Sequence, residues 1–160
     1  MTQEEIISKI KAQFGDEKIT ELENCTPKGI SIQTEDLIEI MTDLHNTEGF
    51  YFDSLSCLSG LDNGPEADTM EVIYNLYSIP YNQHLTVKVA LERKNPKLPS
   101  VESIWRTADW QEREAYDMYG IHFEGHPDLR RILMPADWEG SPLRKDYKQQ
   151  EYYRGVKVEY

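Results

Sequence analysis

Regular sequence patterns stop at Gly120, and this break limits the chain to a compact domain followed by an extended arm. Prolines and glycines interrupt the stretch that follows, so no long helix or strand can form there: Pro127, Pro135, Pro142, Gly125, Gly140 and Gly155. The same stretch holds many apolar and aromatic side chains, which is unlike disordered sequence. We therefore expect a domain over residues 1–120 and, over 121–160, an extended arm laid on another surface.

Helical and strand patterns both occur before the break, which predicts an α+β domain. The patterns predict helices over 2–15, 34–49 and 101–120, and strands over 19–22, 30–32, 50–58, 70–77 and 85–91. The first helix begins with a capping box of Thr2 and Glu5, and Thr34 is the expected cap of the second. Short turns between the last three strands favour antiparallel neighbours. We expect an antiparallel or mixed sheet covered by helices.

The helix expected over 101–120 lacks an apolar residue at one turn of its buried stripe, where Gln111 or Glu112 stands. A carboxylate turned toward the core must be paired or neutralised. We therefore predict that Glu112 has a buried partner, such as an arginine of the arm, which would hold helix and arm in one register. On another face, Asp109, Arg113 and Asp117 have the four-residue spacing of an ion-pair ladder.

Charge is unevenly distributed along the chain, whose net charge is −12. Residues 1–90 carry 16 acidic and 5 basic side chains, whereas residues 91–160 carry 13 and 12. A surface this acidic repels a phosphate backbone, which argues against nucleic acid as a partner. All seven arginines lie in the second part, and arginine is enriched at protein interfaces. We infer one solvated part and one part that contacts other proteins.

Several kinds of site are disfavoured by missing motifs. Cys25 and Cys57 are the only cysteines and no C-x-x-C occurs, so thiolates of this chain do not form a zinc ribbon or hold an iron–sulfur cluster. Cys57 lies in an apolar strand pattern and is predicted to be a small core residue. No glycine-rich phosphate loop and no apolar run of membrane-spanning length is present. Membrane association is expected only through partners.

One catalytic alternative stays open. Two imidazoles and a carboxylate form a common zinc ligand set, and His122, Glu124 and His126 offer one. Their spacing differs from the H-E-x-x-H helix of zinc proteases, and the neighbouring glycines and proline disfavour a helix. A small metal-dependent hydrolase is therefore the weaker interpretation. A free-standing α+β binding module is a third.

Two dense stretches resemble a known family. Residues 105–135 read WRTADWQEREAYDMYGIHFEGHPDLRRILMP, and residues 137–147 read DWEGSPLRKDY. These stretches resemble the C-subunit family of respiratory complex I, the NADH:quinone oxidoreductase, whose members are the "30 kDa" subunits of its peripheral arm. The matching motifs include Glu112-Arg113-Glu114, Asp117, Gly125-His126 and Leu143-Arg144-Lys145-Asp146.

The resemblance implies an N-terminal α/β domain and a C-terminal arm that wraps a partner, the large quinone-site subunit (the D subunit), beside neighbouring iron–sulfur subunits. It implies no flavin, cluster, metal or catalytic residue in this chain, since NAD, FMN, iron–sulfur clusters and quinone are used by other subunits of the proton-translocating complex. The implied role is assembly, in a peripheral position on the cytoplasmic side of the bacterial inner membrane. The alternative is the equivalent subunit of a related membrane-bound hydrogenase or dehydrogenase.

The resemblance and the charge pattern together give a set of residues expected to form the partner interface or to hold the arm. Among them, Arg130, Arg131 and Arg144 are expected to contact acidic groups of the partner. The full set is Glu112, Arg113, Glu114, Asp117, His126, Asp128, Arg130, Arg131, Arg144, Lys145 and Asp146. No catalytic, cofactor-binding or metal-ligating residue is expected.

Overall fold

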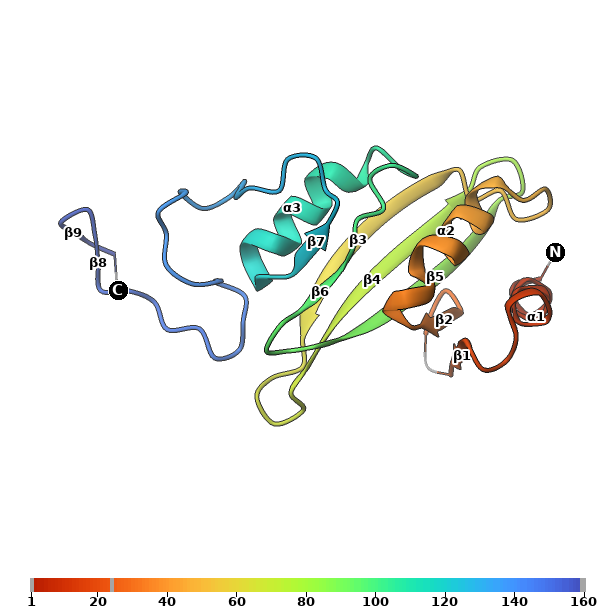
Figure 1. Cartoon of the computed structure of the whole chain (residues 1–160), viewed down its shortest axis with the longest axis horizontal. Helices are drawn as coiled ribbons and strands as arrows, with labels where there is room; N and C mark the ends of the chain where they lie inside the picture. The colour runs from red at the N-terminus through yellow and green to blue at the C-terminus, as the bar shows by residue number, and fades with distance from the viewer. Residues whose placement is uncertain (1, 24, 159–160) are drawn as a thin grey trace.

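A five-stranded mixed sheet forms the centre of the computed structural model, which describes residues 2–23 and 25–158 (Figure 1). The strands are β1 (Ile19–Leu22), β2 (Gly29–Ile32), β3 (Ser54–Asp62), β4 (Thr69–Ser78) and β5 (Gln83–Glu92). Their order across the sheet is β1-β2-β5-β4-β3. Neighbours are antiparallel except β2 and β5, which are parallel. The predicted α+β class is confirmed.

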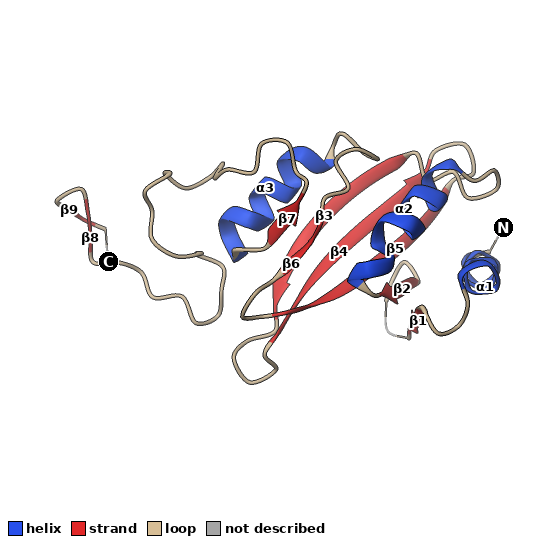
Figure 2. Cartoon of the chain, in the orientation of Figure 1, coloured by secondary structure: helices blue, strands red, loops and turns tan. Residues whose placement is uncertain are grey.

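Alternating burial along β4 shows that one face of this strand lies in the core. Met70, Val72, Tyr74 and Leu76 are buried, and the residues between them are partly exposed. Because side chains of a strand alternate between its two faces, one face of the sheet is apolar. Helices α1 (Gln3–Phe14) and α2 (Leu37–Asn46) contribute buried residues to the same core, and Figure 2 draws α2 in front of the sheet.

The first helix has the predicted capping box, whereas the second differs from its prediction at both ends. Thr34 is not a cap, because it lies in a short 3-10 helix, Thr34–Asp36, that precedes α2. The helix also ends at Asn46, three residues before Gly49. The chain becomes extended at Thr47, whose hydroxyl donates to the Asp43 carboxylate at 2.8 Å. This local side-chain bond competes with continued helix.

A β-bulge in β3 overturns the prediction that Cys57 is a core residue. The pairing with β4 shifts between Leu55 and Cys57, so Ser56 is an extra residue in the strand. Leu55 and Leu58 are therefore buried, while Ser56 and Cys57 are both exposed. The strand also begins at Ser54 rather than at residue 50. The apolar pattern from which the strand was predicted carries no sign of a bulge.

The third helix, α3, spans Ala108–Tyr119 and begins seven residues later than predicted. Turns before it bury Val101 and Trp105, and the Trp105 indole N–H donates to the Phe52 carbonyl at 3.0 Å. These turns imitate the apolar spacing of a helix. At the start of α3, the Gln111 side chain accepts the N–H of Leu58, which ties the helix to edge strand β3.

The first residues of the arm pack with the domain. Strand β6 (Lys97–Pro99) pairs in parallel with β7 (His122–Glu124). Ile121 and Phe123 are buried in the main core. Regular structure therefore continues four residues past Gly120, because a buried apolar pair anchors this part of the chain.

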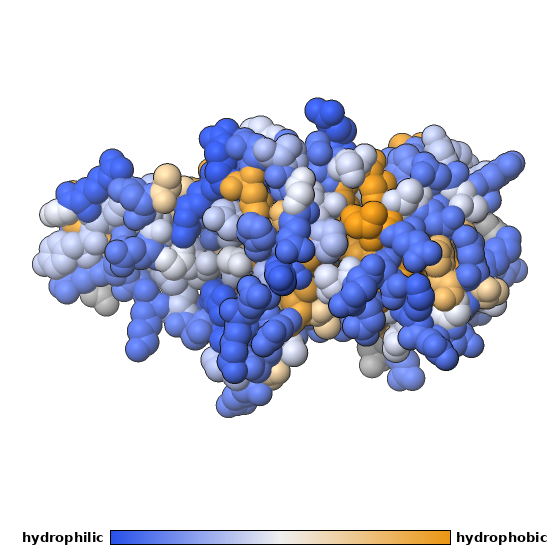
Figure 3. Space-filling model, in the orientation of Figure 1, coloured by the Kyte–Doolittle hydropathy of each residue, from blue (hydrophilic) through white to orange (hydrophobic). Residues whose placement is uncertain are grey.

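Beyond β7 the arm contains only a small hairpin of β8 (Tyr152–Tyr153) and β9 (Val156–Lys157) within the residues that the structure describes. In Figure 1 this hairpin lies at the opposite end of the molecule from α1. No helix among residues 2–23 and 25–158 is long and apolar enough to cross a membrane. Hydrophilic side chains cover most of the face seen in Figure 3, with small hydrophobic patches between them.

Gly60 allows α3 to approach β3, and this contact gives a test of the fold. A Cβ added there would lie 2.8 Å from Tyr119 Cδ2 and 3.1 Å from Ile121 Cδ1. We expect Gly60→Ala to lower the free energy of unfolding by about 1–3 kcal/mol, because the core must shift to admit the methyl group. Urea denaturation measures the loss. The exposed neighbour Ser59→Ala is the control, and equal stability of the two variants would contradict the close packing.

Candidate functional site

The residues highlighted by the sequence gather where the arm lies on the domain, and we call this region the junction. Three buried carboxylates of the domain form its centre: Glu112 and Asp117 on α3, and Asp62 at the end of β3. A buried carboxylate needs hydrogen-bond donors or a proton. The arm supplies hydrogen-bond donors to Asp117 and Asp62 and places His126 3.9 Å from Glu112, so the junction is an attachment site between two parts of one chain.

Glu112 is fully buried, as the gap in the helical stripe predicts. Its Oε2 accepts the Ser100 hydroxyl at 2.5 Å, and its Oε1 accepts the Val101 N–H at 2.8 Å. The arm contributes His126, whose Nε2 lies 3.9 Å from Oε2. The prediction of an arginine partner is therefore wrong. The loop before α3 supplies the donors, and an imidazole takes the place expected for an arginine.

His126 clips the start of the arm onto α3 in a defined tautomer. The Asp128 N–H donates to Nδ1 at 3.0 Å, so that nitrogen must carry a lone pair. The proton is then on Nε2, which donates to the Asp109 carbonyl at 3.0 Å. The Asp109 carboxylate lies 3.3 Å from the same nitrogen. A neutral imidazole, with its side chain fully buried, thus bridges the arm and the first turns of α3.

Burial raises the pKa of Glu112 from its ordinary 4.5 to about 7. The hydrogen bonds from Ser100 and Val101 lower the pKa but do not offset burial. Glu112 therefore exchanges its proton near neutral pH. The sequence-based expectation that this carboxyl is paired or neutralised is met by hydrogen bonds and a raised pKa together.

Asp117 holds the next part of the arm. Its Oδ2 accepts the N–H groups of Ile132, Leu133 and Met134 at 3.0, 2.7 and 2.8 Å, and its Oδ1 accepts the Arg131 guanidinium at 2.7 Å. Burial alone would raise the pKa of Asp117, but these four donors lower it below the ordinary value. The carboxylate is thus a charged anchor for a turn that has no regular secondary structure.

The predicted ladder of Asp109, Arg113 and Asp117 is not the arrangement that forms. Asp117 turns to the arm, and Arg113 is buried with its Nε donating to the Arg130 carbonyl at 3.3 Å. The Arg113 guanidinium lies 5.6 Å from the centre of the Trp110 ring. Arg113 and Asp117 therefore connect α3 to the arm. The arm covers the face of α3 on which an exposed ladder would lie.

A third attachment lies at the end of β3 and was not predicted from the sequence. Asp62 accepts Arg93 through Nε at 2.7 Å and Nη2 at 2.9 Å, and it accepts the Lys145 N–H at 2.8 Å. Arg93 also reaches Asp146 at 2.7 Å. The Arg93 guanidinium, helped by the backbone N–H groups, holds the pKa of Asp62 well below its usual range despite burial. The sequence does contain a signal for this site. Asp62 lies an even number of residues after Leu58, so both side chains point to the buried face of β3.

The remaining predicted residues divide into internal and exposed ones. Arg131 and Arg144 are used within the chain, the latter donating to the Arg93 carbonyl at 3.3 Å. Arg130 is exposed and pairs with Asp128 at 2.9 Å. Glu114 is exposed on α3 and lies outside the junction. Arg130 thus stays a candidate for partner contact, whereas Arg131 and Arg144 are occupied by groups of this chain.

The zinc alternative finds no support in the geometry. His122 and Glu124 are exposed on β7, and the ring of His122 lies against Tyr116. The side chain of His126 is fully buried against α3. In the part of the chain that the structure describes, no three His, Cys, Asp or Glu side chains are placed to hold a metal ion.

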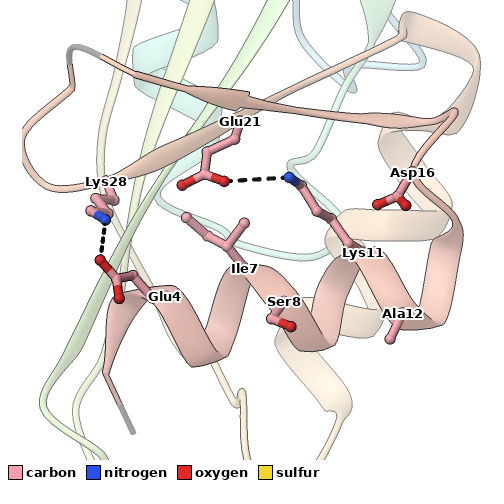
Figure 4. A pocket seen from close by; sticks show the side chains of 8 residues that line it. All are labelled: Glu4, Ile7, Ser8, Lys11, Ala12, Asp16, Glu21 and Lys28. Carbon is pink, nitrogen blue, oxygen red and sulfur yellow. Dashed lines mark hydrogen bonds and ion pairs between the residues drawn. The ribbon is translucent and has the colours of Figure 1, made fainter.

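An open groove of about 540 Å³ between α1 and the β1–β2 hairpin is shown in Figure 4. Two ion pairs cross it, Lys11 to Glu21 at 3.3 Å and Lys28 to Glu4 at 2.6 Å. These charges neutralise one another across the groove. The pairs are exposed and contribute little to stability. The four side chains Glu4, Lys11, Glu21 and Lys28 are thus paired with one another. They connect α1 to the hairpin and are not left unpaired for a ligand.

Comparison with known proteins decides the family. The profile described as "Respiratory-chain NADH dehydrogenase, 30 Kd subunit" matches residues 30–153, well over half of the chain. The chain belongs to this family. The predicted resemblance is confirmed. The match includes all three attachments of the junction.

Relatives of the 30 kDa subunit family agree with this assignment. The C subunit of the NADH-quinone oxidoreductase of Chloroherpeton thalassium is 56% identical over 118 residues, covering 73% of this chain and 48% of the relative. The C subunit of Chlorobium phaeobacteroides is 54% identical over 110 residues, covering 68% and 66%. The C/D subunit of Azotobacter vinelandii is 44% identical over 153 residues, covering 90% and 26%. The chain spans about half the length of the first of these relatives.

Two solved structures share the fold. A trypsin-resistant fragment (1-134) of Nqo5 matches with a TM-score of 0.67 and 29% identity, covering 81% of this chain and all of the fragment. The structure of an archaeal membrane-bound sulfane sulfur reductase matches with a TM-score of 0.75 and 20% identity, covering 91% and 85%. The second likeness concerns the fold alone.

The raised pKa of Glu112 makes a prediction about pH. Because the pKa in the folded state, about 7, exceeds the ordinary 4.5, the folded chain keeps this proton when the unfolded chain has lost it. The contribution is fully present below about pH 4.5 and is lost as pH rises toward 7. Relative to Glu112→Gln, the parent should lose about 3 kcal/mol of unfolding free energy between pH 4.5 and about 8. Denaturation at several pH values measures this. Parallel curves for parent and variant would refute the burial effect, and Glu114→Gln is the exposed control.

Loss of the Asp117 anchor should loosen the arm. Asp117→Asn removes the charge that holds Arg131 and replaces an acceptor with a group that also donates. We expect the free energy of unfolding to fall by about 3 kcal/mol, and trypsin to cut faster at Arg144 and Lys145. Glu114→Gln on the same helix should behave as the parent. Unchanged cleavage of the Asn variant would show that the arm is held without this carboxylate.

Proposed function

We propose that this chain is a non-catalytic structural and assembly subunit in the peripheral arm of a proton-translocating NADH:quinone oxidoreductase. One observation carries the proposal: the chain is 56% identical over 118 residues to a protein named as the C subunit of an NADH-quinone oxidoreductase. The junction is consistent with a structural role. Its buried acids are engaged by Ser100, the arm backbone and basic side chains, so they are used to hold two parts of the chain together.

The proposed partner is the large quinone-site subunit, the D subunit of the complex, with neighbouring iron–sulfur subunits beside it. A relative named as a C/D subunit, which matches 90% of this chain, supports the pairing because a fused chain holds two proteins at one place. In this proposal NAD, FMN, iron–sulfur clusters and quinone are bound by other subunits and none by this chain. Arg130 is a candidate for contact with an acidic group of the partner.

The proposed location follows from the proposed assembly. The chain would lie on the cytoplasmic side of the bacterial inner membrane and be peripheral, held there by its partners. The junction would matter to assembly in a specific way. It holds the arm on α3 and β3, so the partner would meet a preformed surface and the cost of ordering the arm on binding would be reduced.

Purification from the native host tests the proposal. We expect a tagged chain, purified from gently solubilised membranes, to bring the D subunit and iron–sulfur proteins with it in stoichiometric amounts by mass spectrometry. Asp117→Asn should lower the yield of the assembled complex, because the arm is no longer held, whereas Glu114→Gln should not. Recovery of the tagged parent chain alone would overturn the proposed function.

A further inference from the structure

The turn that follows β3 contains the only Asn-Gly pair in the sequence, Asn63-Gly64. Such a pair is chemically labile, because a backbone nitrogen can attack the asparagine side chain before it and glycine has no Cβ to hinder the approach. The other asparagines of the chain precede proline, which has no N–H, or residues that carry a side chain. Asn63 is therefore the asparagine of this chain that is most open to this attack.

The reaction needs no reagent other than water. The Gly64 nitrogen bonds to Cγ of Asn63, the Cγ–Nδ2 bond breaks, and the side-chain nitrogen leaves as ammonia together with the proton of the Gly64 nitrogen. Water then opens the succinimide ring at either carbonyl, which yields aspartate or isoaspartate. Isoaspartate routes the backbone through the side chain and lengthens the turn by one carbon. Both products carry a negative charge that asparagine lacks.

Folding holds both reacting groups in hydrogen bonds. The Gly64 N–H donates to Oδ1 of Asp62 at 3.0 Å, and Nδ2 of Asn63 donates to the Thr69 hydroxyl at 3.0 Å. Loss of the Gly64 proton would create a second negative charge beside the buried Asp62 carboxylate. Because its pKa is held well below the usual range, this carboxylate is also a poor base for removing that proton. The folded turn therefore opposes the attack.

The arm covers the same peptide bond. Lys145 donates its N–H to Oδ2 of Asp62 at 2.8 Å, and its Nζ lies 3.5 Å from the Asn63 carbonyl oxygen. A Cβ added at Gly64 would lie 3.2 Å from Cδ of Lys145, so the lysine side chain lies directly on this glycine. Gly64 is buried as a result. The turn is therefore free to rearrange once the arm has left.

We propose that Asn63 is a deamidation site that the attached arm keeps closed. A chain whose arm detaches at Lys145 uncovers the turn, forms the succinimide and becomes modified at Asn63. The longer isoaspartate turn no longer holds Gly64 in register with Asp62, so the arm does not regain its attachment. This inference goes beyond the proposed function and does not rest on it, because every contact that carries it lies within this chain.

Peptide mass spectrometry of the full chain at mildly alkaline pH tests the inference. The deamidated fraction at Asn63 is followed over time in buffer and in urea, where the chain is unfolded. We expect the folded parent to deamidate about tenfold more slowly or less, because only locally opened molecules react. Asp117→Asn loosens the arm at a distance from the turn and should raise the rate in buffer about threefold or more. Glu114→Gln, the exposed control on the same helix, should keep the parent rate.

A second variant tests the arm at the turn itself. Lys145→Ala removes the side chain that lies on Gly64 but keeps the N–H that Asp62 accepts. We expect the rate in buffer to rise about threefold, whereas Lys148→Ala, at an exposed lysine of the arm, should keep the parent rate. Circular dichroism checks that the variants fold. Equal rates of all variants in urea separate a change in protection from a change in reactivity.

Four results would overturn the inference. Absence of deamidation at Asn63 in urea would show that the site is not reactive, and equal rates in urea and in buffer would show that folding does not protect it. Parent rates for both Asp117→Asn and Lys145→Ala would show that the arm is not what closes the site. Finally, trypsin should cut aged chains with isoaspartate at position 63 faster at Arg144 than unmodified chains, and equal cleavage would refute the lasting detachment.

Discussion

The buried carboxylate of Asp117 is the interaction on which the arrangement of domain and arm depends. A charged group away from water needs several donors, and α3 itself offers none at this position because its N–H groups bond along the helix. The turn formed by Ile132, Leu133 and Met134 has the opposite need, since its N–H groups have no strand or helix to join. Each side satisfies the other, so an irregular segment is held in place without joining a strand or a helix.

Two further contacts between arm and domain lie before and after the Asp117 contact along the arm. His126 reaches α3 beside Glu112, and the Lys145 N–H reaches Asp62. The ionisation states differ in a useful way: burial raises the pKa of Glu112, whereas donors hold the pKa values of Asp62 and Asp117 low. One attachment therefore depends on a proton near neutral pH, and two depend on charge. Arg131 and Arg144 of the arm are thus used within the chain.

Much of the fold could be predicted from local pattern. Apolar residues that alternate with others along 85–91 predicted β5, and the capping box of Thr2 and Glu5 placed the start of α1. Local sequence patterns gave wrong predictions where the structure departs from a regular repeat. A bulge turned Cys57 outward, and turns around Val101 and Trp105 imitated a helix. The site was predicted in part. The burial of Glu112 was predicted correctly, but its partner and the role of Asp62 depended on residues distant in sequence.

The sequence by itself determined the α+β class, the absence of long regular elements after Gly120, the carboxylate at position 112 in an apolar stripe and the resemblance to the 30 kDa subunit family. Each follows from neighbours within a few turns or from motifs read in order. Only the tertiary structure decided that Arg93 binds Asp62, that Arg131 binds Asp117 and that the last described residues of the arm stand apart. The reason is physical: which donor reaches a buried acid depends on where the folded chain brings it, and spacing in the sequence does not record that distance.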